Sequence, residues 1–162
     1  MNIFVTVGTH SQGFDRLIKE VDELLIKEKI KDKVFAQIGN TKYIPKKIIF
    51  KKFLNEKEYL KNFKKADLII SHAGAGSIIN ALKLNKKLIL VPRLKKFNEH
   101  TDNHQIELAK EIRKKYMHPY IINMAYLSNC VKKLQKKKIH KNINKNFIGK
   151  EIEKFLNQLK NK

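Results

Sequence analysis

The sequence predicts a single α/β domain with a doubly wound parallel sheet and helices on both faces. Short, continuous apolar runs alternate along the chain with longer segments whose apolar residues recur every three or four positions. Strands that are apolar throughout are typical of parallel sheets buried on both faces. The 162 residues, 42% of them hydrophobic, suffice for one domain with a core, and no repeat or Pro-, Gly- or Ser-rich linker divides the chain.

Six short apolar runs are the expected strands. Several of them stop at residues that break a strand: Gly8 follows the first run, Gly39 the second and Pro92 the fifth. In chain order, the expected strands are residues 3–7, 34–38, 48–50, 68–71, 88–91 and 119–122.

The segments between these runs have helical periodicity. After the first strand, Leu17, Val21 and Leu24 recur at spacings of four and three. Before the fourth strand, Tyr59 and Phe63 share one side of a helix. In chain order, the expected helices are residues 14–25, 56–65, 77–84 and 102–115, followed by two near 124–135 and 147–160.

The net charge of +21 has three interpretations. Only three of the 36 basic residues are arginines, so one interpretation is drift toward lysine in an AT-rich genome. The second is an anionic membrane or a partner surface, where each nearby lysine contributes on the order of 1 kcal/mol. The third is nucleic acid, which is least favoured because arginine is the usual reader of guanine and only Arg16, Arg93 and Arg113 are present.

The composition also bounds the class of protein. No run approaches the roughly 18 apolar residues that a membrane span needs. The opening MNIFVTVGTH lacks the charged region of a signal peptide and is interpreted as a first strand. The single cysteine, Cys130, excludes an intrachain disulfide and a thiolate metal site, and a reducing cytoplasm fits these features.

Ligands of doubly wound sheets bind at the carboxyl ends of the strands, which selects three loops here: residues 8–13, 71–77 and 92–105. The first loop, GTHSQG, places hydroxyls and the His10 imidazole before a helix N-terminus, which attracts anions. It lacks the spacing of a dinucleotide-binding loop or a P-loop. It is therefore either an anion-binding turn or a tight turn capped by Ser11.

The second loop, SHAGAGS, is a candidate diphosphate site. Gly74 and Gly76 lack a Cβ, so a ligand can approach the backbone closely. Ser77 either caps the next helix or donates to a phosphate oxygen, and His72 either donates to the ligand or is a satisfied turn histidine. A Ser77 nucleophile with His72 as its base is disfavoured, because the spacing is not G-x-S-x-G.

The third loop contains Asp102-Asn103-His104-Gln105, with Asp102 as the expected helix cap. The amides and imidazole of this stretch offer both donors and acceptors, which a hydroxyl-rich ligand needs. His100 and His104 have the i, i+4 spacing of a metal clip, but no glutamate follows His100 and no third ligand is evident. We therefore expect no metal.

Together these loops carry a resemblance. SHAGAGS at 71–77, followed by NEHTDNHQIELAKEI at 98–112, resembles the C-terminal, donor-binding domain of family 28 glycosyltransferases. The opening IFVTVGTHSQGFDRLIKEVD, residues 3–22, is similar to split members of that family. These are the catalytic subunit that adds the second N-acetylglucosamine to a dolichol-linked sugar, and bacterial counterparts in exopolysaccharide and capsule synthesis. GTH in place of GTT is more similar to the bacterial branch, and the resemblance covers roughly residues 1–125.

The resemblance implies a single Rossmann-like domain equivalent to the C-terminal half of a GT-B enzyme, which transfers a sugar from a UDP-sugar with inversion and without metal or cofactor. It implies a separate membrane-anchored subunit that supplies the acceptor half, and a lipid-linked (polyprenyl-diphosphate) saccharide as acceptor. The chain would lie in the cytoplasm, peripheral at the inner face of the membrane through that subunit. N-acetylglucosamine, galactose and glucuronic acid all fit as the sugar.

The resemblance also assigns site residues. The donor's nucleotide and diphosphate fall to His72, Gly74, Ala75, Gly76 and Ser77, the sugar to Asn103, His104 and Gln105, and the diphosphate or acceptor side to Gly8, Thr9 and His10. Asn80 stands where relatives commonly carry a glutamate that accepts from the ribose, and its carbonyl accepts without charge assistance. The general base is often on the acceptor half, so His10 is the one candidate in this chain.

Residues 126–162 are expected to form a basic helical segment, which either belongs to the same domain or docks on the partner. In the second case its lysines would face anionic lipid. One side of its last helix is apolar: Phe147, Ile148, Ile152, Phe155, Leu156 and Leu159. The alternative to an enzyme subunit is a non-enzymatic nucleotide-sugar or basic nucleic-acid binding module, favoured by the charge, by Asn80 and by the missing base.

Overall fold

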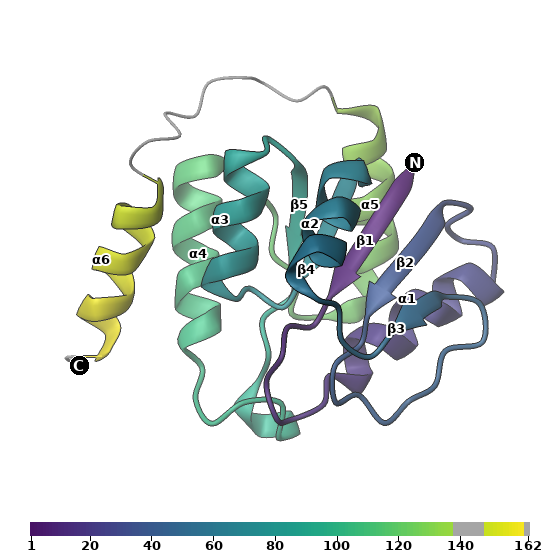
Figure 1. Ribbon diagram of the computed structural model, residues 1–162, viewed down its shortest axis with the longest axis horizontal. Helices are drawn as coiled ribbons and strands as arrows, with labels where there is room; N and C mark the ends of the chain where they lie inside the picture. The colour runs from purple at the N-terminus through teal and green to yellow at the C-terminus, as the bar shows by residue number, and fades with distance from the viewer. Residues whose placement is uncertain (138–147, 161–162) are drawn as a thin grey trace.

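The computed structural model describes residues 1–137 and 148–160 (Figure 1). Its five parallel strands form one sheet in the order β3-β2-β1-β4-β5, which confirms the predicted α/β class. The strands are β1 (Asn2–Thr6), β2 (Lys33–Gln37), β3 (Ile49–Lys51), β4 (Leu68–Ser71) and β5 (Lys87–Leu90).

The strand order reverses at β1. The chain runs outward from β1 through β2 to β3, and then returns to place β4 on the other side of β1. Thr6 at the end of β1 is in register with Gln37 on one side and Ser71 on the other. The segments that follow β1 and β4 therefore start side by side at the edge of the sheet where doubly wound folds bind ligands.

Helices cover both faces of the sheet (Figure 1). Side chains alternate between the faces: Ile3 and Val5 of β1 join the core under the first helix, whereas Phe4 joins the opposite core, where it meets Phe63 edge-on. One face carries α1 (Asp15–Ile26) and α5 (Leu127–Lys136); the other carries α2 (Glu56–Lys65), α3 (Ala75–Lys83), α4 (His104–Tyr116) and α6 (Ile148–Lys160). Two short 3-10 helices are η1 (Lys95–Phe97) and η2 (Met124–Tyr126).

The expected sixth strand at 119–122 is wrong. A single bridge, between Leu90 and Tyr120, joins this segment to the sheet. The N–H of Leu90 donates to the Pro119 carbonyl at 2.9 Å, and the N–H of Ile121 donates to the Leu90 carbonyl at 2.7 Å. Pro119 has no N–H with which to extend the ladder, and Asn123 already caps η2.

Three helices begin two or three residues from where they were expected. α5 begins at Leu127 rather than near residue 124, because residues 124–126 form η2. α3 begins at Ala75, so Gly76 and Ser77 lie in its first turn.

α4 begins at His104, and the expectation that Asp102 caps it is wrong. The N-cap is Asn103, which makes no side-chain cap hydrogen bond, while the carboxylate of Asp102, one residue further out, accepts the N–H of His104 at 2.9 Å.

The last helix, α6, packs on α3 and α4 of its own domain. Ile148, Ile152 and Leu159 are buried there, and Glu151 accepts a hydrogen bond from the Tyr116 hydroxyl at 2.7 Å. Phe147, assigned from the sequence to the same apolar side, lies outside the described residues. Among residues 1–137 and 148–160, none of the helices has the length and hydropathy of a transmembrane span.

The buried carboxylate of Asp22 in α1 fixes the segment between β2 and β3. It accepts the N–H groups of Lys46, Lys47 and Ile48 at 2.8–3.1 Å and the hydroxyl of Tyr43 at 2.8 Å. Burial alone raises the pKa of Asp22, but these hydrogen bonds outweigh burial and hold the pKa below its ordinary value. The same contact raises the pKa of Tyr43 to about 12.

We expect Asp22→Asn to lower the free energy of unfolding by about 1–3 kcal/mol near neutral pH, because an amide accepts fewer and weaker hydrogen bonds. A folded-state pKa below the unfolded value means that the carboxylate stabilises the fold above the unfolded pKa. That stability is lost as the pH falls through the folded pKa. Urea unfolding from about pH 7 to pH 3 should show the difference shrinking toward acid. With the exposed Glu153→Gln as control, a difference that stays constant with pH would contradict this account.

Candidate functional site

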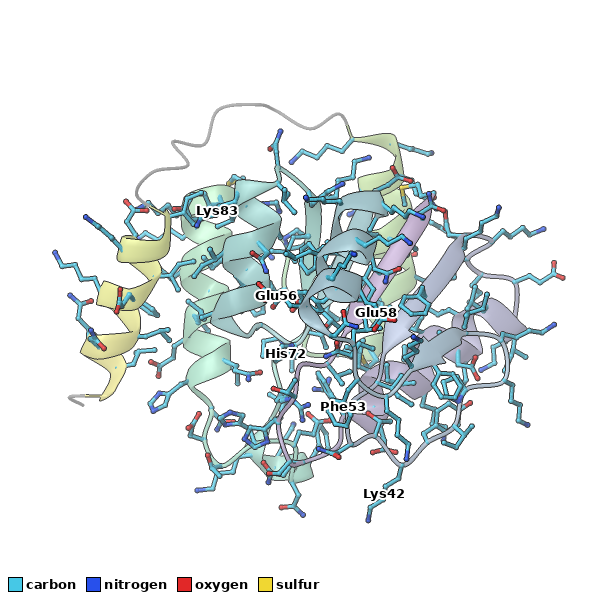
Figure 2. All side chains as sticks on the ribbon, viewed as in Figure 1. Lys42, Phe53, Glu56, Glu58, His72 and Lys83 are labelled. Carbon is cyan, nitrogen blue, oxygen red and sulfur yellow. The ribbon has the colours of Figure 1, made fainter. Side chains whose placement is uncertain are left out.

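The three predicted loops gather at the carboxyl edge of the sheet (Figure 1). One follows β1, one joins β4 to α3, and one joins β5 to α4 through η1. Figure 2 labels His72 at this edge and Lys83 at the far end of α3. The structure therefore brings the three predicted loops together, and the contacts among them define what a site here could do.

His72 lies between two glycines. A Cβ on Gly8 would come within 2.7 Å of the His72 ring, and a Cβ on Gly74 would collide with His72 Nε2. Gly8 also has φ +74°, a conformation that side chains with a Cβ rarely adopt. Both glycines are thus required by the imidazole itself, and they let it sit against the backbone at the strand ends.

The environment of His72 fixes its protonation. Its Nδ1 lies 3.3 Å from the Thr6 carbonyl oxygen, which can only accept, so the ring carries its hydrogen on Nδ1. Burial, and next the positive charge of Arg93, lower the pKa of His72 to about 4. Near neutral pH, Nε2 is therefore an acceptor rather than the donor anticipated from the sequence, and it suits a ligand hydroxyl or N–H.

The N-terminus of α3 is open to a ligand. The N–H groups of Ala75, Gly76 and Ser77 have no hydrogen-bond partner in the described chain, as the first turn of a helix requires. A Cβ on Gly76 would meet nothing within 4 Å, so this residue faces open space. The unpaired N–H groups and the helix dipole together favour an anion here.

The hydroxyl of Ser77 is already used within the turn. It donates to the Gly74 carbonyl at 2.8 Å and lies 2.5 Å from the Ser71 hydroxyl, which must then be the donor of that pair. Ser77 therefore offers a ligand its backbone N–H, while its side chain holds the turn. Asn80, one turn further, is half-buried, and its side chain has no hydrogen-bond partner in the described chain.

The third loop brings its polar residues to the start of α4. Gln105 accepts the N–H of Arg93 on its Oε1 at 3.0 Å, which leaves its amide hydrogens free to donate. Asn103 accepts the N–H of Lys95 at 3.2 Å, and His104 is exposed. Thr9, in the first loop, is exposed as well.

Arg93, which the sequence did not single out as a site residue, holds the loops together. Its side chain is 1% exposed. Its Nη2 donates to the Val7 carbonyl at 2.8 Å, and its Nη1 approaches the carbonyls of Gln12, Gly13 and Glu99 at 2.8–2.9 Å. Burial lowers the pKa of Arg93 to about 10, and the Glu99 carboxylate opposes this, so the group stays charged. The signal available in the sequence was the rarity of arginine in a lysine-rich chain, since only a guanidinium donates in several directions at once.

A second arginine continues this network. Arg16 makes a two-pronged contact with the Glu99 carboxylate, from Nε at 2.9 Å and from Nη2 at 2.8 Å. It also donates to the carbonyls of Pro92 and Ile122 at 2.9 and 3.0 Å. Glu99 accepts the N–H of Leu94 at 2.9 Å, so the loop after β5 is anchored to α1.

Two more histidines face each other beside His72. The ring centroids of His10 and His100 are 4.8 Å apart. The Nδ1 of His10 accepts the N–H of Gln12 at 3.2 Å, so its hydrogen is on Nε2. Burial, then the neighbouring His100 and Arg93, lower the pKa of His10. In this arrangement His10 presents a donor at Nε2, which does not favour the general-base role considered from the sequence.

No group of three or more His, Cys, Asp or Glu side chains is arranged to hold a metal within residues 1–137 and 148–160. His100 and His104, whose spacing suggested a metal clip, have different surroundings. His100 Nδ1 accepts the N–H of Asp102 at 3.3 Å, while the His104 residue is exposed.

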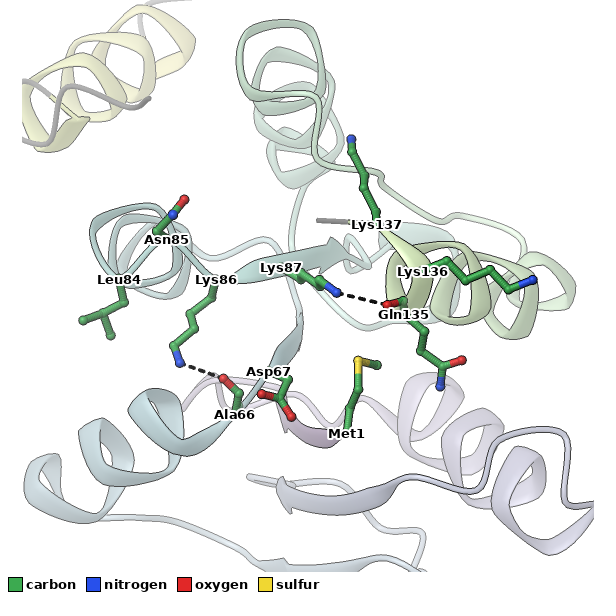
Figure 3. A pocket seen from close by; sticks show the side chains of 10 residues that line it. All are labelled: Met1, Ala66, Asp67, Leu84, Asn85, Lys86, Lys87, Gln135, Lys136 and Lys137. Carbon is green, nitrogen blue, oxygen red and sulfur yellow. Dashed lines mark hydrogen bonds between the residues drawn. The ribbon is translucent and has the colours of Figure 1, made fainter. Parts of the chain in front are cut away.

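A hollow of about 550 Å³ lies at the opposite, amino-terminal end of the strands (Figure 3). Lysines line it, but two of them stabilise helix ends. Lys86 Nζ donates to the carbonyls of Lys64 and Ala66 at the end of α2, and Lys87 Nζ donates to the Gln135 carbonyl of α5 at 3.3 Å. Cations at helix C-termini are favourable. None of the predicted site residues lines this hollow.

The family description "Glycosyltransferase family 28 C-terminal domain" matches residues 2–159. A Homo sapiens protein named UDP-N-acetylglucosamine transferase subunit ALG13 is 40% identical over 121 residues, which is 69% of this chain and 10% of that protein. Its namesake in Saccharomyces cerevisiae is 48% identical over 65 residues, 40% of this chain and 26% of that protein. The chain thus spans a small part of the curated relatives it matches.

Solved structures show the same fold. An NMR solution structure of ALG13 superposes with a TM-score of 0.63 at 21% identity, covering 96% of this chain and 94% of that one. MurG of Acinetobacter baumannii superposes with a TM-score of 0.60 at 17% identity, covering 99% of this chain and 50% of MurG. The spinosyn forosaminyltransferase SpnP superposes with a TM-score of 0.64 at 12% identity, covering 99% of this chain and 43% of SpnP. The chain thus corresponds to about one half of these two enzymes, as expected for half of a GT-B fold.

We expect two glycine-to-alanine changes to act in opposite directions. Gly8→Ala should lower the free energy of unfolding by about 2–4 kcal/mol, because it combines a positive φ with a clash against His72. Gly76→Ala should be neutral or raise it by up to about 1 kcal/mol, because its Cβ meets open space in a helix. Urea unfolding of both variants measures this. Equal effects would mean that the His72 ring does not lie between the glycines.

Proposed function

From the premise that the chain belongs to the glycosyltransferase family 28 C-terminal domains, we propose that it is the donor-binding subunit of a two-component, inverting UDP-N-acetylglucosamine transferase. The family match supports a glycosyltransferase, and the names of the human and yeast relatives support UDP-N-acetylglucosamine and a subunit. Galactose and glucuronic acid, which the sequence left open, are less favoured by those names.

One observation carries the proposal: the open N-terminus of α3 beside His72. Three unpaired N–H groups, at Ala75, Gly76 and Ser77, would receive the diphosphate of the donor. Nearby, Asn80 would accept from a ribose hydroxyl through its carbonyl. The free amide of Gln105, with Asn103 and His104, would contact the sugar.

The chemistry needs a leaving group that is stabilised as it departs. A hydroxyl oxygen of the acceptor attacks the anomeric carbon from the face opposite the diphosphate, and the bond from that carbon to the diphosphate oxygen breaks. The acceptor proton passes to a base, which we place on the partner subunit because His10 presents a donor. The charge that appears on UDP meets the N–H groups and dipole of α3, which replace a metal ion in this proposal.

The remaining parts of the proposal concern assembly. A membrane-anchored subunit would supply the acceptor half and a lipid-linked saccharide in polysaccharide or glycan synthesis, and would hold this chain at the cytoplasmic face of the membrane. The net charge of +21 supports a role for anionic lipid. Because α6 is already packed on α3 and α4, the partner would have to contact other surfaces than its buried apolar side.

Calorimetric titration with UDP-N-acetylglucosamine, UDP-galactose, UDP-glucuronate, UDP, ADP and GDP tests the donor assignment. We expect saturable binding of UDP-N-acetylglucosamine that is unchanged by EDTA and abolished by Gly76→Trp, whose ring would fill the diphosphate site. Gln105→Ala should lower the affinity for the sugar nucleotide about tenfold, or by about 1.4 kcal/mol, and leave the affinity for UDP unchanged.

Gly149→Trp is the matched control for Gly76→Trp. Gly149 also lies in a helix, on α6, and a Cβ added to it would likewise meet nothing within 4 Å. If both variants lose binding, the effect of Gly76→Trp is a general effect of tryptophan and does not support a diphosphate site at Gly76. Binding of a short RNA alone, with steep salt dependence, would favour the nucleic-acid module and overturn the proposal.

We expect the chain to sediment with vesicles that contain anionic lipid and not with neutral vesicles, because the lysines gain only from a charged surface. Salt should weaken this binding as the Debye length shortens. Gly76→Trp should bind vesicles like the unaltered chain, since the donor site is not involved. Equal binding to both kinds of vesicle, or binding unaffected by salt, would argue against a lipid role for the charge.

A further inference from the structure

A second hollow adjoins the candidate donor site. It has a volume of about 640 Å³ and lies between the loop after β1, the start of α1, the loop after β2 and the η1 turn. The residues that the argument uses are Ser11, Gln12, Asn40, Lys42, Phe97 and Asn98. None of the residues assigned above to the UDP-sugar lines it.

The hollow and the donor site are formed by neighbouring segments. His10 directly precedes Ser11, and His100 directly follows Glu99, so the two facing imidazoles belong to segments that line the hollow. Both rings are close enough to His72 to lower its pKa. The Asn40 side chain on the hollow side donates to the His10 carbonyl at 2.9 Å. A ligand in the hollow would therefore lie next to the donor.

The charge of the hollow differs from that of the chain. Its four charged residues are Asp15, Arg16, Lys42 and Glu99, which sum to zero, and Arg16 and Glu99 already pair with each other. The chain as a whole carries +21, and the hollow at the other end of the sheet is lined by four lysines and one aspartate. Neutrality within so basic a protein disfavours a phosphate or a nucleic acid and favours an uncharged polar ligand.

The surfaces of the hollow suit a sugar. Phe97 is 51% exposed, and its ring is steadied by the Arg16 guanidinium 5.4 Å from the centroid. Lys96 also approaches the ring, but on an exposed side chain that a ligand can displace. Around the ring, hydroxyl and amide groups offer donors and acceptors. Gln12 adds a buried Oε1 without a hydrogen-bond partner in the described residues, which a ligand hydroxyl or a water could satisfy after a small rotation.

We propose that this hollow is a saccharide subsite, in which the uncharged sugar of the acceptor binds with its apolar face on Phe97 and its hydroxyls on Ser11, Gln12 and Asn98. The proposal rests on the proposed transferase function. It assigns to the donor-binding chain itself a part of the acceptor recognition that a two-component enzyme would otherwise leave to its partner.

Backbone NMR of the labelled chain, saturated with UDP-N-acetylglucosamine, tests the subsite separately from the donor site. Titration with N-acetylglucosamine and its β-1,4 disaccharide up to about 50 mM, where even a Kd of several mM is visible, should shift the amides of residues 11–12, 40–42 and 97–98. Phe97→Ala should lower the affinity for the disaccharide at least tenfold and leave the affinity for UDP-N-acetylglucosamine unchanged. Phe53→Ala, which removes another half-exposed ring outside the hollow, is the matched control and should change neither affinity.

Absence of saccharide shifts around the hollow, shifts confined to residues 74–77, or equal weakening by both phenylalanine changes would overturn the subsite. The donor titration is read independently, from the amides of residues 74–77 on addition of UDP-N-acetylglucosamine. If those amides do not shift, the proposed transferase function fails, whatever the saccharide does at the hollow.

Discussion

The site depends on one buried guanidinium. Arg93 follows β5, yet its donors reach backbone carbonyls from the loop after β1 and from the loop that leads to α4. Burying a positive charge is costly, and here several oxygen acceptors and the nearby Glu99 carboxylate offset that cost. His10 and His100 lie on segments that Arg93 binds, which brings them together, while His72 is held by the Thr6 carbonyl beside the Val7 that Arg93 also binds. A lysine could not replace Arg93, since a single ammonium cannot donate over the same spread of directions.

Much of the fold could be predicted from periodicity, because the parallel strands are buried on both faces and stay apolar throughout. The expected strand at 119–122 failed because the apolar pattern was given more weight than Pro119, which lacks the donor that a ladder requires. Periodicity also placed the start of α3 too late, because Ala75 and Gly76 carry no apolar pattern although they are helical.

The sequence predicted which loops form the candidate site, but not the hydrogen bonds among their side chains. The rule that ligands bind at strand ends selected three loops that the structure brings together, and the glycines predicted an open helix N-terminus at α3. The hydrogen-bond partners of individual side chains could not be predicted from the sequence. The hydroxyl of Ser77 turns inward, and the tautomer of His72 depends on a carbonyl 66 residues away. The Arg16–Glu99 pair spans 83 residues, and nothing local in either stretch predicts it. Likewise, the net charge of the chain does not predict the charge of each hollow. Some lysines cap helix ends, while the charged residues of the hollow near the histidines sum to zero.

The distance along the chain between Arg93 and its acceptors has a consequence for folding. The contact from Arg93 to Val7 joins residues 86 apart, and β1 cannot acquire both neighbours until β4 has been made. Contacts of such high sequence separation close slowly, because the entropy of the intervening loop is lost before any contact is gained. A partly folded or truncated chain that lacks β5 would therefore retain the glycine turns and still have no site. During synthesis, the arrangement of the three loops would be complete only after the last strand of the sheet has been made and docked.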